Sequence, residues 1–291
     1  MHIWPDCVPC ITKMGIELAR LAFKDEQRVH QFAEEMLKLP PLRGENWNTI
    51  SPRVVREVWR KVTQESGNYD PMREIKAKQN RKALEMYPMA KELVAEAADP
   101  FLTALKLAIV GNSLDAMVSV KDDGAQGLVK SLDSLAINLE EVSAFRERVS
   151  KAHTILYFTD NCGEIVFDKL FLETLHTLYD LKVTAVTRTV PILNDALLKD
   201  AEEISLSSVA TLMENGIQEG VAGTIVAEVS PRVRSLIDES DLIIAKGVGN
   251  YDAFTEETWL KGKLTMLFHG KCHPCCDPQG APLGSLVVYN F

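Results

Sequence analysis

Short apolar runs alternate with helical segments over the second half of the chain, and no other feature constrains the fold as strongly. The runs are residues 155–159, 183–187, 242–245, 265–268 and 286–289. Because such alternation is typical of βαβ units, it predicts a mostly parallel, doubly wound sheet within a three-layer α/β/α fold. Right-handed crossovers then bring several strand ends to one edge of the sheet.

The first 110 or so residues have the pattern of helices instead. Ile11, Met14 and Leu18 recur at helical spacing, as apolar residues do in the helices expected after them. A polar connection follows, and we place a domain boundary there. The sequence therefore predicts an all-helical N-terminal domain, residues 1–120, packed on an α/β/α domain, residues 121–291.

One helix of the N-terminal part is expected to run from Met72 to Tyr87 and to end at Pro88. Lys76 and Asn80 would lie one turn apart on one of its faces. We interpret them as part of a face exposed to water, because a stripe of polar side chains on a helix is usually solvated.

Charge and composition exclude several classes of partner. The chain has 291 residues and a net charge of −9, and it has no basic tract of the kind that binds nucleic acid. No apolar run approaches the roughly 20 residues of a membrane span, and the N-terminus lacks the plan of a signal peptide. We therefore expect a cytoplasmic protein with a small-molecule partner, no nucleic acid and no membrane. The sequence does not indicate an oligomeric state.

The strand over residues 155–159 ends abruptly at Asp160 and Asn161, and Glu164 lies in the first turn of the helix that follows. In an open α/β sheet, ligands bind at the carboxyl ends of the strands. The same residue types also form turns and helix N-caps, so this motif taken alone favours a structural cap.

Two further strand ends carry polar residues and glycines. These residues are Arg188, Asn194 and Asp195 after residues 183–187, and Lys246, Gly247, Gly249 and Asn250 after residues 242–245. Because three strand ends deliver such groups to one edge of the sheet, the recurrence favours a functional crevice over three unrelated caps.

The residue types in this crevice suit phosphate chemistry. Asp160, Asn161 and Asp195 supply hard oxygen ligands, which favour Mg²⁺, Mn²⁺, Co²⁺ or Ni²⁺ over a soft metal. Lys246 can act as a point charge on phosphate oxygens, and glycines let backbone N–H groups approach a ligand closely. A bound divalent ion would polarise the phosphoryl group and activate a water molecule.

Asn112 and Asp115 are two further candidates. They follow the apolar helix expected over residues 101–110 and are flanked by apolar residues on both sides. Buried polar groups must be paired, so the two side chains either cap a helix internally or face a ligand, and the sequence leaves both readings open.

Competing enzyme classes lack specific residues. G-V-G-N-Y-D lacks the third glycine of a dinucleotide fingerprint, and no G-x-x-x-x-G-K-[ST] loop is present. Haloacid-dehalogenase phosphatases would need a second Asp where Cys162 stands, and cysteine phosphatases would need a Cys-x5-Arg loop. We interpret Cys162 as a small filler residue.

Four motifs taken together resemble one family. G-N-S-L-D, D-N-C-G-E, P-I-L-N-D and A-K-G-V-G-N-Y-D are similar to motifs of the damage-control phosphatases, long called domain of unknown function 89. The N-terminal C-V-P-C, D-P-M-R-E-I-K with Asn80, and the late K-C-H-P resemble the archaeal and bacterial stand-alone branch of that family.

This resemblance implies a helical part packed on a three-layer α/β/α part, and a metal-dependent phosphatase of small phosphorylated metabolites such as sugar phosphates. It implies Asp160, Asn161 and Asp195 as metal ligands. The residues that it places around the substrate are Asn112, Asp115, Glu164, Arg188, Lys246 and Asn250. We add Asn194, Gly247 and Gly249 to the substrate-binding set.

The cysteines near the two ends of the chain allow three readings. Cys7, Cys10, Cys272 and either Cys275 or Cys276 could form a tetrahedral zinc site. A disulfide is the second reading, and buried free thiols are the third.

The leading hypothesis is a divalent-metal-dependent phosphatase in which Asp115 or Glu164 positions the attacking water. A methyltransferase-type enzyme is one alternative, with G-V-G-N approaching a nucleoside cofactor. A non-catalytic protein that binds metal or sugar phosphate in the same crevice is the other.

Overall fold

A central sheet determines where the loops of the molecule meet. The computed structural model describes residues 1–111 and 132–291. In this part of the chain a six-stranded sheet has the order β3-β2-β1-β4-β5-β6, and neighbouring strands are parallel except β5 and β6. The strands are β1 (Thr154–Phe158), β2 (Lys182–Thr187), β3 (Thr211–Glu214), β4 (Leu242–Lys246), β5 (Leu264–His269) and β6 (Leu286–Asn290). The predicted mostly parallel α/β fold is confirmed.

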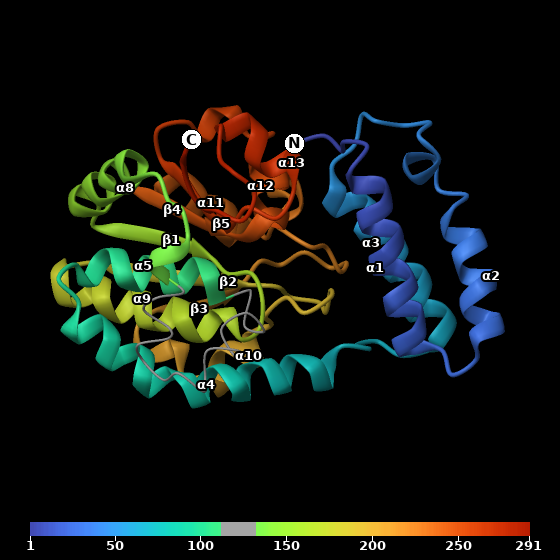
Figure 1. Cartoon of the computed structure of the whole chain (residues 1–291), viewed down its shortest axis with the longest axis horizontal. Coiled ribbons are helices and arrows are strands. Elements are labelled where there is room, and N and C mark those ends of the chain that lie inside the picture. Colours follow the sequence, from blue (N-terminus) through green and yellow to red (C-terminus); the bar gives the residue numbers. More distant parts are fainter. Residues whose placement is uncertain (112–131) are drawn as a thin grey trace.

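Helices cover both faces of this sheet (Figure 1). The α-helices that the structure describes are α1 (Cys7–Ala22), α2 (Glu26–Met36), α3 (Ser51–Ser66), α4 (Arg73–Glu96), α5 (Pro100–Val110), α8 (Leu139–Lys151), α9 (Glu164–Leu178), α10 (Leu198–Glu203), α11 (Pro231–Glu239), α12 (Gly247–Phe254) and α13 (His273–Cys276). One face of the sheet packs on α4, α5, α8 and α9, and the other packs on α11, α12 and α13. None of the helices that the structure describes is both long and apolar enough to cross a membrane.

Side chains of β1 divide between two hydrophobic cores. Ile155 and Tyr157 belong to the core under α5 and α9, whereas Leu156 and Phe158 belong to the core under α11 and α12. Successive side chains of a strand point to opposite faces, so a strand covered on both sides must be apolar throughout. This packing explains why the central strands have continuous apolar runs.

The edge strand β3 was not predicted from the sequence. It has four residues, pairs only with β2, and its two central residues, Leu212 and Met213, are half-buried. An edge strand exposes part of its surface to water and therefore lacks the continuous apolar run of a central strand.

Helix α4 continues beyond the predicted end at Pro88 and reaches Glu96. A proline removes one helical hydrogen bond, yet Met86 before it and Ala90 and Val94 after it are buried in the same core. Tertiary packing on both sides of the proline therefore outweighs its local effect.

Helices α1, α2 and α3 pack around a core of their own and stand beside the α/β part (Figure 1). In contrast, α4 and α5 share a core with α9 and the sheet. The predicted junction at residue 120 lies outside the described residues, so the division into 1–120 and 121–291 stays a prediction. Hydrophobic packing groups α4 and α5 with the sheet.

The contact between α3 and α12 includes a buried carboxylate, Asp252, that accepts a hydrogen bond from the hydroxyl of Ser51. Burial raises the pKa of Asp252 from 3.8 to about 6, against the effect of that hydrogen bond. Because the folded state holds this proton to higher pH than the unfolded state, stability falls as the pH rises from 4 through 6. That difference in pKa corresponds to about 3 kcal/mol.

We therefore expect Asp252→Asn to gain stability relative to the wild type as the pH rises. The difference in unfolding free energy, measured by urea titration, should shift in favour of the variant by about 3 kcal/mol between pH 4 and pH 7. Asp238→Asn, which changes an exposed carboxylate, should show no such trend. Parallel pH profiles for wild type and Asp252→Asn would contradict the assignment.

Candidate functional site

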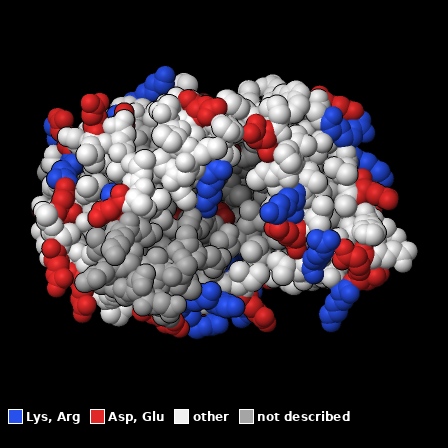
Figure 2. Space-filling view, viewed as in Figure 1, with Lys and Arg blue, Asp and Glu red and all other residues white. Residues whose placement is uncertain are grey.

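The loops after β1, β2 and β4 meet at one edge of the sheet. The chain runs outward from β1 to β3 and then returns to place β4 beside β1, so the order of the strands reverses between these two. Such a switch point opens a crevice at the carboxyl ends of the strands. Figure 2 shows a hollow between the α1–α3 part and the α/β part, with atoms of acidic side chains visible inside it.

The loops after β1 and β2 are joined by backbone hydrogen bonds. Asn161 and Asp195 form an isolated antiparallel bridge, and the N–H of Ala196 donates to the carbonyl of Asp160 at 2.8 Å. The N–H of Cys162 donates to the carbonyl of Asn194 at 2.9 Å. These bonds bring Asp160, Asn161 and Asp195 together, as the sequence predicts.

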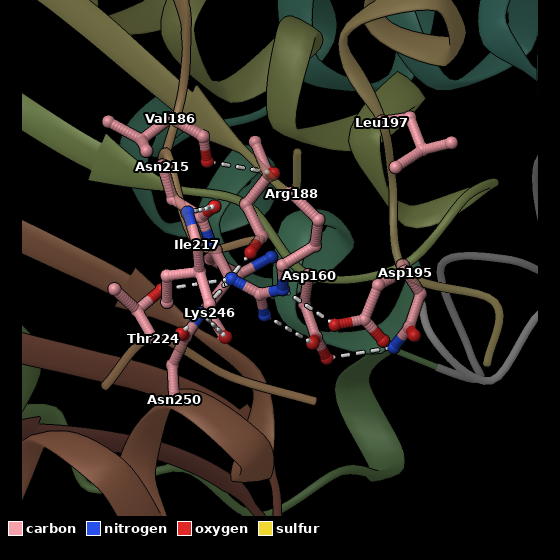
Figure 3. Close-up of polar contacts among 12 residues, drawn as sticks. Asp160, Val186, Arg188, Asp195, Leu197, Asn215, Ile217, Thr224, Lys246 and Asn250 are labelled. Atoms are coloured by element: carbon pink, nitrogen blue, oxygen red, sulfur yellow. Dashed lines mark hydrogen bonds and ion pairs between the residues drawn. The ribbon is translucent and has the colours of Figure 1, made fainter. Parts of the chain in front are cut away.

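A buried arginine links the two carboxylates (Figure 3). Arg188 is 2% exposed, and its Nε donates to Asp195 Oδ2 at 2.7 Å. Its Nη2 forms an ion pair with Asp160 Oδ1 at 3.6 Å, and its Nη1 donates to Thr224 Oγ1 at 3.0 Å. Arg188 therefore fixes the relative positions of the carboxylates and supplies a positive charge between them.

Negative charge is concentrated around Asp160. Burial, followed by the charges of Asp195 and Glu164, raises the pKa of Asp160 well above its usual range, against the effect of Arg188. Burial also raises the pKa of Asp195, although Arg188 opposes this. The site thus holds more carboxylate than its own cations balance.

Gly247 and Gly249 pack closely against other segments of the protein and are not open to a ligand. Gly247 has a φ of +80°, and a Cβ at this position would overlap the carboxylate of Asp160. A Cβ on Gly249 would lie 2.6 Å from the carbonyl oxygen of Ala222. The absence of side chains therefore lets Asp160 and residue 222 approach α12.

The donors at this edge fit a hard divalent cation. Asp160, Asn161 and Asp195 offer carboxylate and amide oxygens, which such ions prefer. The carboxylate of Asp160 packs directly against Gly247, so it has little freedom to move. No group of three or more His, Cys, Asp or Glu side chains in residues 1–111 and 132–291 is arranged as a metal site, so this set depends on the amide of Asn161.

Lys246 is fully paired within the protein. Its Nζ donates to Ala108 O at 2.8 Å, Glu164 Oε1 at 2.5 Å and Asp168 Oδ1 at 2.6 Å. Burial alone would lower the pKa of Lys246, but Asp168 and Glu164 raise it above its usual value. The predicted contact of Lys246 with phosphate would therefore require the ammonium to leave one of these acceptors.

We expect Lys246→Met to reduce the unfolding free energy by about 3–5 kcal/mol, because it leaves two buried carboxylates without their counter-ion. Chemical denaturation measures this loss. Lys91→Met is the matched control, since it breaks the exposed ion pair with Glu173 and should cost about 1 kcal/mol or less. Equal effects of the two substitutions would show that Lys246 is not a structural ion-pair partner.

Lys76 and Asn80 are buried, so the prediction that they lie on a solvated face was wrong. Lys76 is 0% exposed and Asn80 is 3% exposed, and Asn80 Oδ1 accepts a hydrogen bond from the N–H of Gly163 at 2.6 Å. The signal was present in the sequence, because both residues fall on the same helix face as the buried Ala83 and Ala90. Only packing against the loop after β1 made that face an interior one.

Of the remaining predicted residues, the structure describes Asn250 and Asn194. Asn250 is buried and accepts from Arg188 Nη1 at 3.4 Å, while Asn194 Nδ2 donates to Gln79 Oε1 at 3.3 Å. Asn112 and Asp115 lie outside the described residues. Asp168 was not predicted, although an acidic residue one turn after Glu164 that directly follows three apolar residues is a signal of pairing.

The terminal cysteines are not bonded to one another in this structure, and the zinc site stays a prediction. All six cysteines are free thiols, and in the described ranges Cys7, Cys10, Cys272 and Cys275 are not arranged as a metal site. Cys272 Sγ donates to Cys275 Sγ at 3.5 Å, and Cys275 is fully buried in the core under α12. Of the three readings, buried thiols describe Cys275 best.

Cys162 is likewise a packing residue in this structure. It is 2% exposed and lies in the core shared by α5 and α9. Burial raises the pKa of its thiol above the usual value, which opposes formation of a nucleophilic thiolate.

Among the pockets lined by described residues, one lies away from this site and one lies next to it. A pocket of about 860 Å³ lies at the amino ends of β1 and β2, beside Thr154 and Lys182, which is the opposite edge of the sheet. A pocket of about 530 Å³ lies between the start of α4 and the loop after β2, and Asp70, Arg73 and Thr189 are among its lining residues. The second pocket adjoins the candidate site.

Known proteins with similar sequences and structures are found in archaea. The chain is 32% identical over 294 residues to a damage-control phosphatase of Archaeoglobus fulgidus, and the match covers 99% of both chains. It is 25% identical over 290 residues to damage-control phosphatase PH1575 of Pyrococcus horikoshii, covering 99% of this chain and 97% of that protein. The crystal structure of the PH1575 protein, described as a DUF89 family protein, matches with a TM-score of 0.86 and 26% identity over 100% and 99% of the two chains.

These matches extend over the whole chain and confirm the resemblance seen in the sequence motifs. The model of the damage-control phosphatase ARMT1-like domain matches residues 3–287. The chain therefore belongs to the damage-control phosphatase ARMT1-like family.

Proposed function

We propose that this protein is a divalent-metal-dependent phosphatase that hydrolyses small phosphorylated metabolites. The observation that carries the proposal is the pairing of Asp160 and Asp195 through buried Arg188 at the switch point of the sheet. Family membership and the names of the relatives support phosphatase chemistry. The site offers hard oxygen donors for a cation and cationic N–H groups for a phosphate.

Asp160, Asn161 and Asp195 would hold the metal ion in this proposal. A divalent ion bound there would polarise the phosphoryl group and lower the pKa of a bound water. Oxygen ligands of this kind suit Mg²⁺, Mn²⁺, Co²⁺ and Ni²⁺ alike.

Arg188 and Glu164 have atoms available for the substrate. Arg188 Nη2 makes no hydrogen bond within the described part of the chain, so it can donate to an oxygen of the phosphoryl group. Glu164 Oε1 accepts a hydrogen bond from Lys246 Nζ, whereas Glu164 Oε2 has no hydrogen-bond partner among the described residues. Glu164 Oε2 is therefore suited to orient the attacking water and to accept its proton.

The test is hydrolysis of p-nitrophenyl phosphate and of a panel of sugar phosphates by chelator-stripped protein. Each of the four metals is added separately, and released orthophosphate is measured. Turnover that appears only with metal supports the proposal. No release of orthophosphate with any metal and any substrate would overturn it.

The transferase alternative is less well supported by the geometry. It needs the backbone of G-V-G-N to face a nucleoside cofactor, yet Gly247 faces the Asp160 carboxylate and Gly249 faces the backbone of Ala222 and Gly223. A thermal shift with S-adenosylmethionine in the absence of metal would favour this alternative over the phosphatase.

A further inference from the structure

Two buried lysines lie beside the candidate site, and they differ in their hydrogen bonds. Lys246 donates to three acceptors, as described above. Lys76 is equally buried, and its Nζ lies 2.7 Å from Asp70 Oδ2 as an ion pair. Within residues 1–111 and 132–291, neither Lys76 Nζ nor either carboxylate oxygen of Asp70 has a hydrogen-bond partner of good geometry. Lys76 therefore has N–H donors for which the described residues supply no hydrogen-bond acceptor.

A buried ammonium without hydrogen bonds is costly, since water would otherwise satisfy its N–H groups. A hydrophobic side chain at this position would fill the same space at lower cost. An under-paired lysine in a buried position is therefore a sign of a ligand with acceptor oxygens.

The segment of α4 around Lys76 contacts both loops that carry the predicted metal ligands. One turn after Lys76, Asn80 accepts from the N–H of Gly163 in the loop after β1. Gln79 accepts from Asn194 in the loop after β2. These two contacts direct the buried face of α4 toward the space between the two loops.

The positive charges of Lys76 and Arg188 both act on the carboxylate of Asp195. The charge of Lys76 opposes the rise that burial causes in the pKa of Asp195, and its effect is smaller than that of Arg188. Lys76 and Arg188 thus bring positive charge to Asp195 from two different elements, α4 and the loop after β2.

The partner of Lys76 borders a pocket on the α4 side. Asp70, the partner of Lys76, lines the pocket of about 530 Å³ that also includes Thr189, the residue next to Arg188. Arg73 and Lys199 contribute positive charge to the same pocket, and Glu202 and Glu214 contribute negative charge. The pocket thus brings side chains of both charges beside the Lys76–Asp70 ion pair.

We propose that Lys76 is a phosphate-binding lysine of this site. Its ammonium donates to an oxygen of the phosphoryl group, while Asp70 holds the ammonium in place, and Lys246 keeps its separate role as the partner of Glu164 and Asp168. The inference rests on the proposed phosphatase function and assigns a substrate contact to a residue on α4.

The test compares orthophosphate binding, measured by calorimetry, with steady-state kinetics on p-nitrophenyl phosphate. Lys76→Met removes the charge, and Lys78→Met makes the same change at an exposed position of the same helix. We expect Lys76→Met to weaken orthophosphate binding about 10-fold or more and to lower kcat/KM about 10- to 100-fold. Lys78→Met should leave both unchanged, and Lys76→Arg should restore part of the binding.

A double variant separates phosphate binding from folding. In Lys76→Met with Asp70→Asn, both charges of the ion pair are removed, so no buried carboxylate is left unpaired. We expect this variant to keep the Tm of the wild type and still bind orthophosphate weakly. Wild-type affinity for orthophosphate in either variant would overturn the role of Lys76, as would failure of the wild type to bind orthophosphate.

The same experiment distinguishes this inference from the proposed function. If the wild type hydrolyses no phosphate ester with any metal, the phosphatase proposal fails. If the wild type hydrolyses esters and Lys76→Met does so with an unchanged kcat/KM, only the assignment of Lys76 fails.

Discussion

Asp160→Asn should abolish phosphatase turnover and leave the fold intact. The substitution keeps the size of the side chain and removes the charge of a carboxylate that faces Asp195 and Arg188. We expect kcat to fall by about three orders of magnitude or more, because a neutral amide cannot replace that charge at the reacting centre. Steady-state hydrolysis of p-nitrophenyl phosphate with saturating metal measures the loss.

Unlike its activity, the stability of the Asp160→Asn variant should not fall. Burial and neighbouring carboxylates raise the pKa of Asp160 well above its usual range, which means that the folded protein disfavours its ionised form. The chelator-stripped Asp160→Asn protein should therefore have a Tm equal to or above that of the wild type. A variant that lost activity because it unfolded would contradict this interpretation of the site.

Asp241→Asn is the matched control for the loss of an aspartate beside β1. Asp241 accepts hydrogen bonds from the N–H groups of His153 and Thr154 at the amino end of this strand, far along the sheet from Asp160. It should lose some stability and keep its turnover. If Asp160→Asn retained activity comparable to Asp241→Asn, the assignment of Asp160 would be wrong.

Gly247→Ala should impair both stability and turnover through a single added methyl group. The new Cβ would overlap the Asp160 carboxylate, and the φ of +80° at this position is unfavourable for a residue with a side chain. We expect the unfolding free energy to fall by about 2–4 kcal/mol. We also expect kcat/KM to fall about 100-fold, because Asp160 must move from its place.

Gly262→Ala separates the backbone effect from the steric one. Gly262 has a φ of +92°, and a Cβ there would meet nothing within 4 Å. It should therefore cost about 1 kcal/mol and leave the kinetics unchanged. Denaturation curves and kinetics of the two alanine variants give the comparison. Gly247→Ala with the activity of Gly262→Ala would show that Gly247 does not position Asp160.

The positions of the central strands followed from the sequence for a clear physical reason. A strand such as β1, which has Ile155 and Tyr157 in one core and Leu156 and Phe158 in the other, must be apolar along its whole length. The edge strand β3 faces no such requirement and was missed. The extent of α4 beyond Pro88 was also missed, because the contacts that support it come from other helices.

The candidate site was predicted in part. Asp160, Asn161, Arg188 and Asp195 were recognised from their place after strands, and the structure brings them together. The partners of Lys246 were not recognised, since Glu164 and Asp168 lie on a helix far from it in sequence. Sequence proximity indicates which side chains leave a strand end, but not which of them neutralise one another.

By itself, the sequence determined the α/β class, the strand ends that carry polar groups and the family to which the chain belongs. Each of these depends on local pattern: the apolar period of strands and helices, and residue types at fixed positions after a strand. Only the tertiary structure decided that Lys76 is buried beside Asp70, that Lys246 is paired with Glu164 and Asp168, and that Gly247 holds Asp160 in place. The reason is that burial and charge pairing are set by elements distant in sequence, which meet only when the chain is folded.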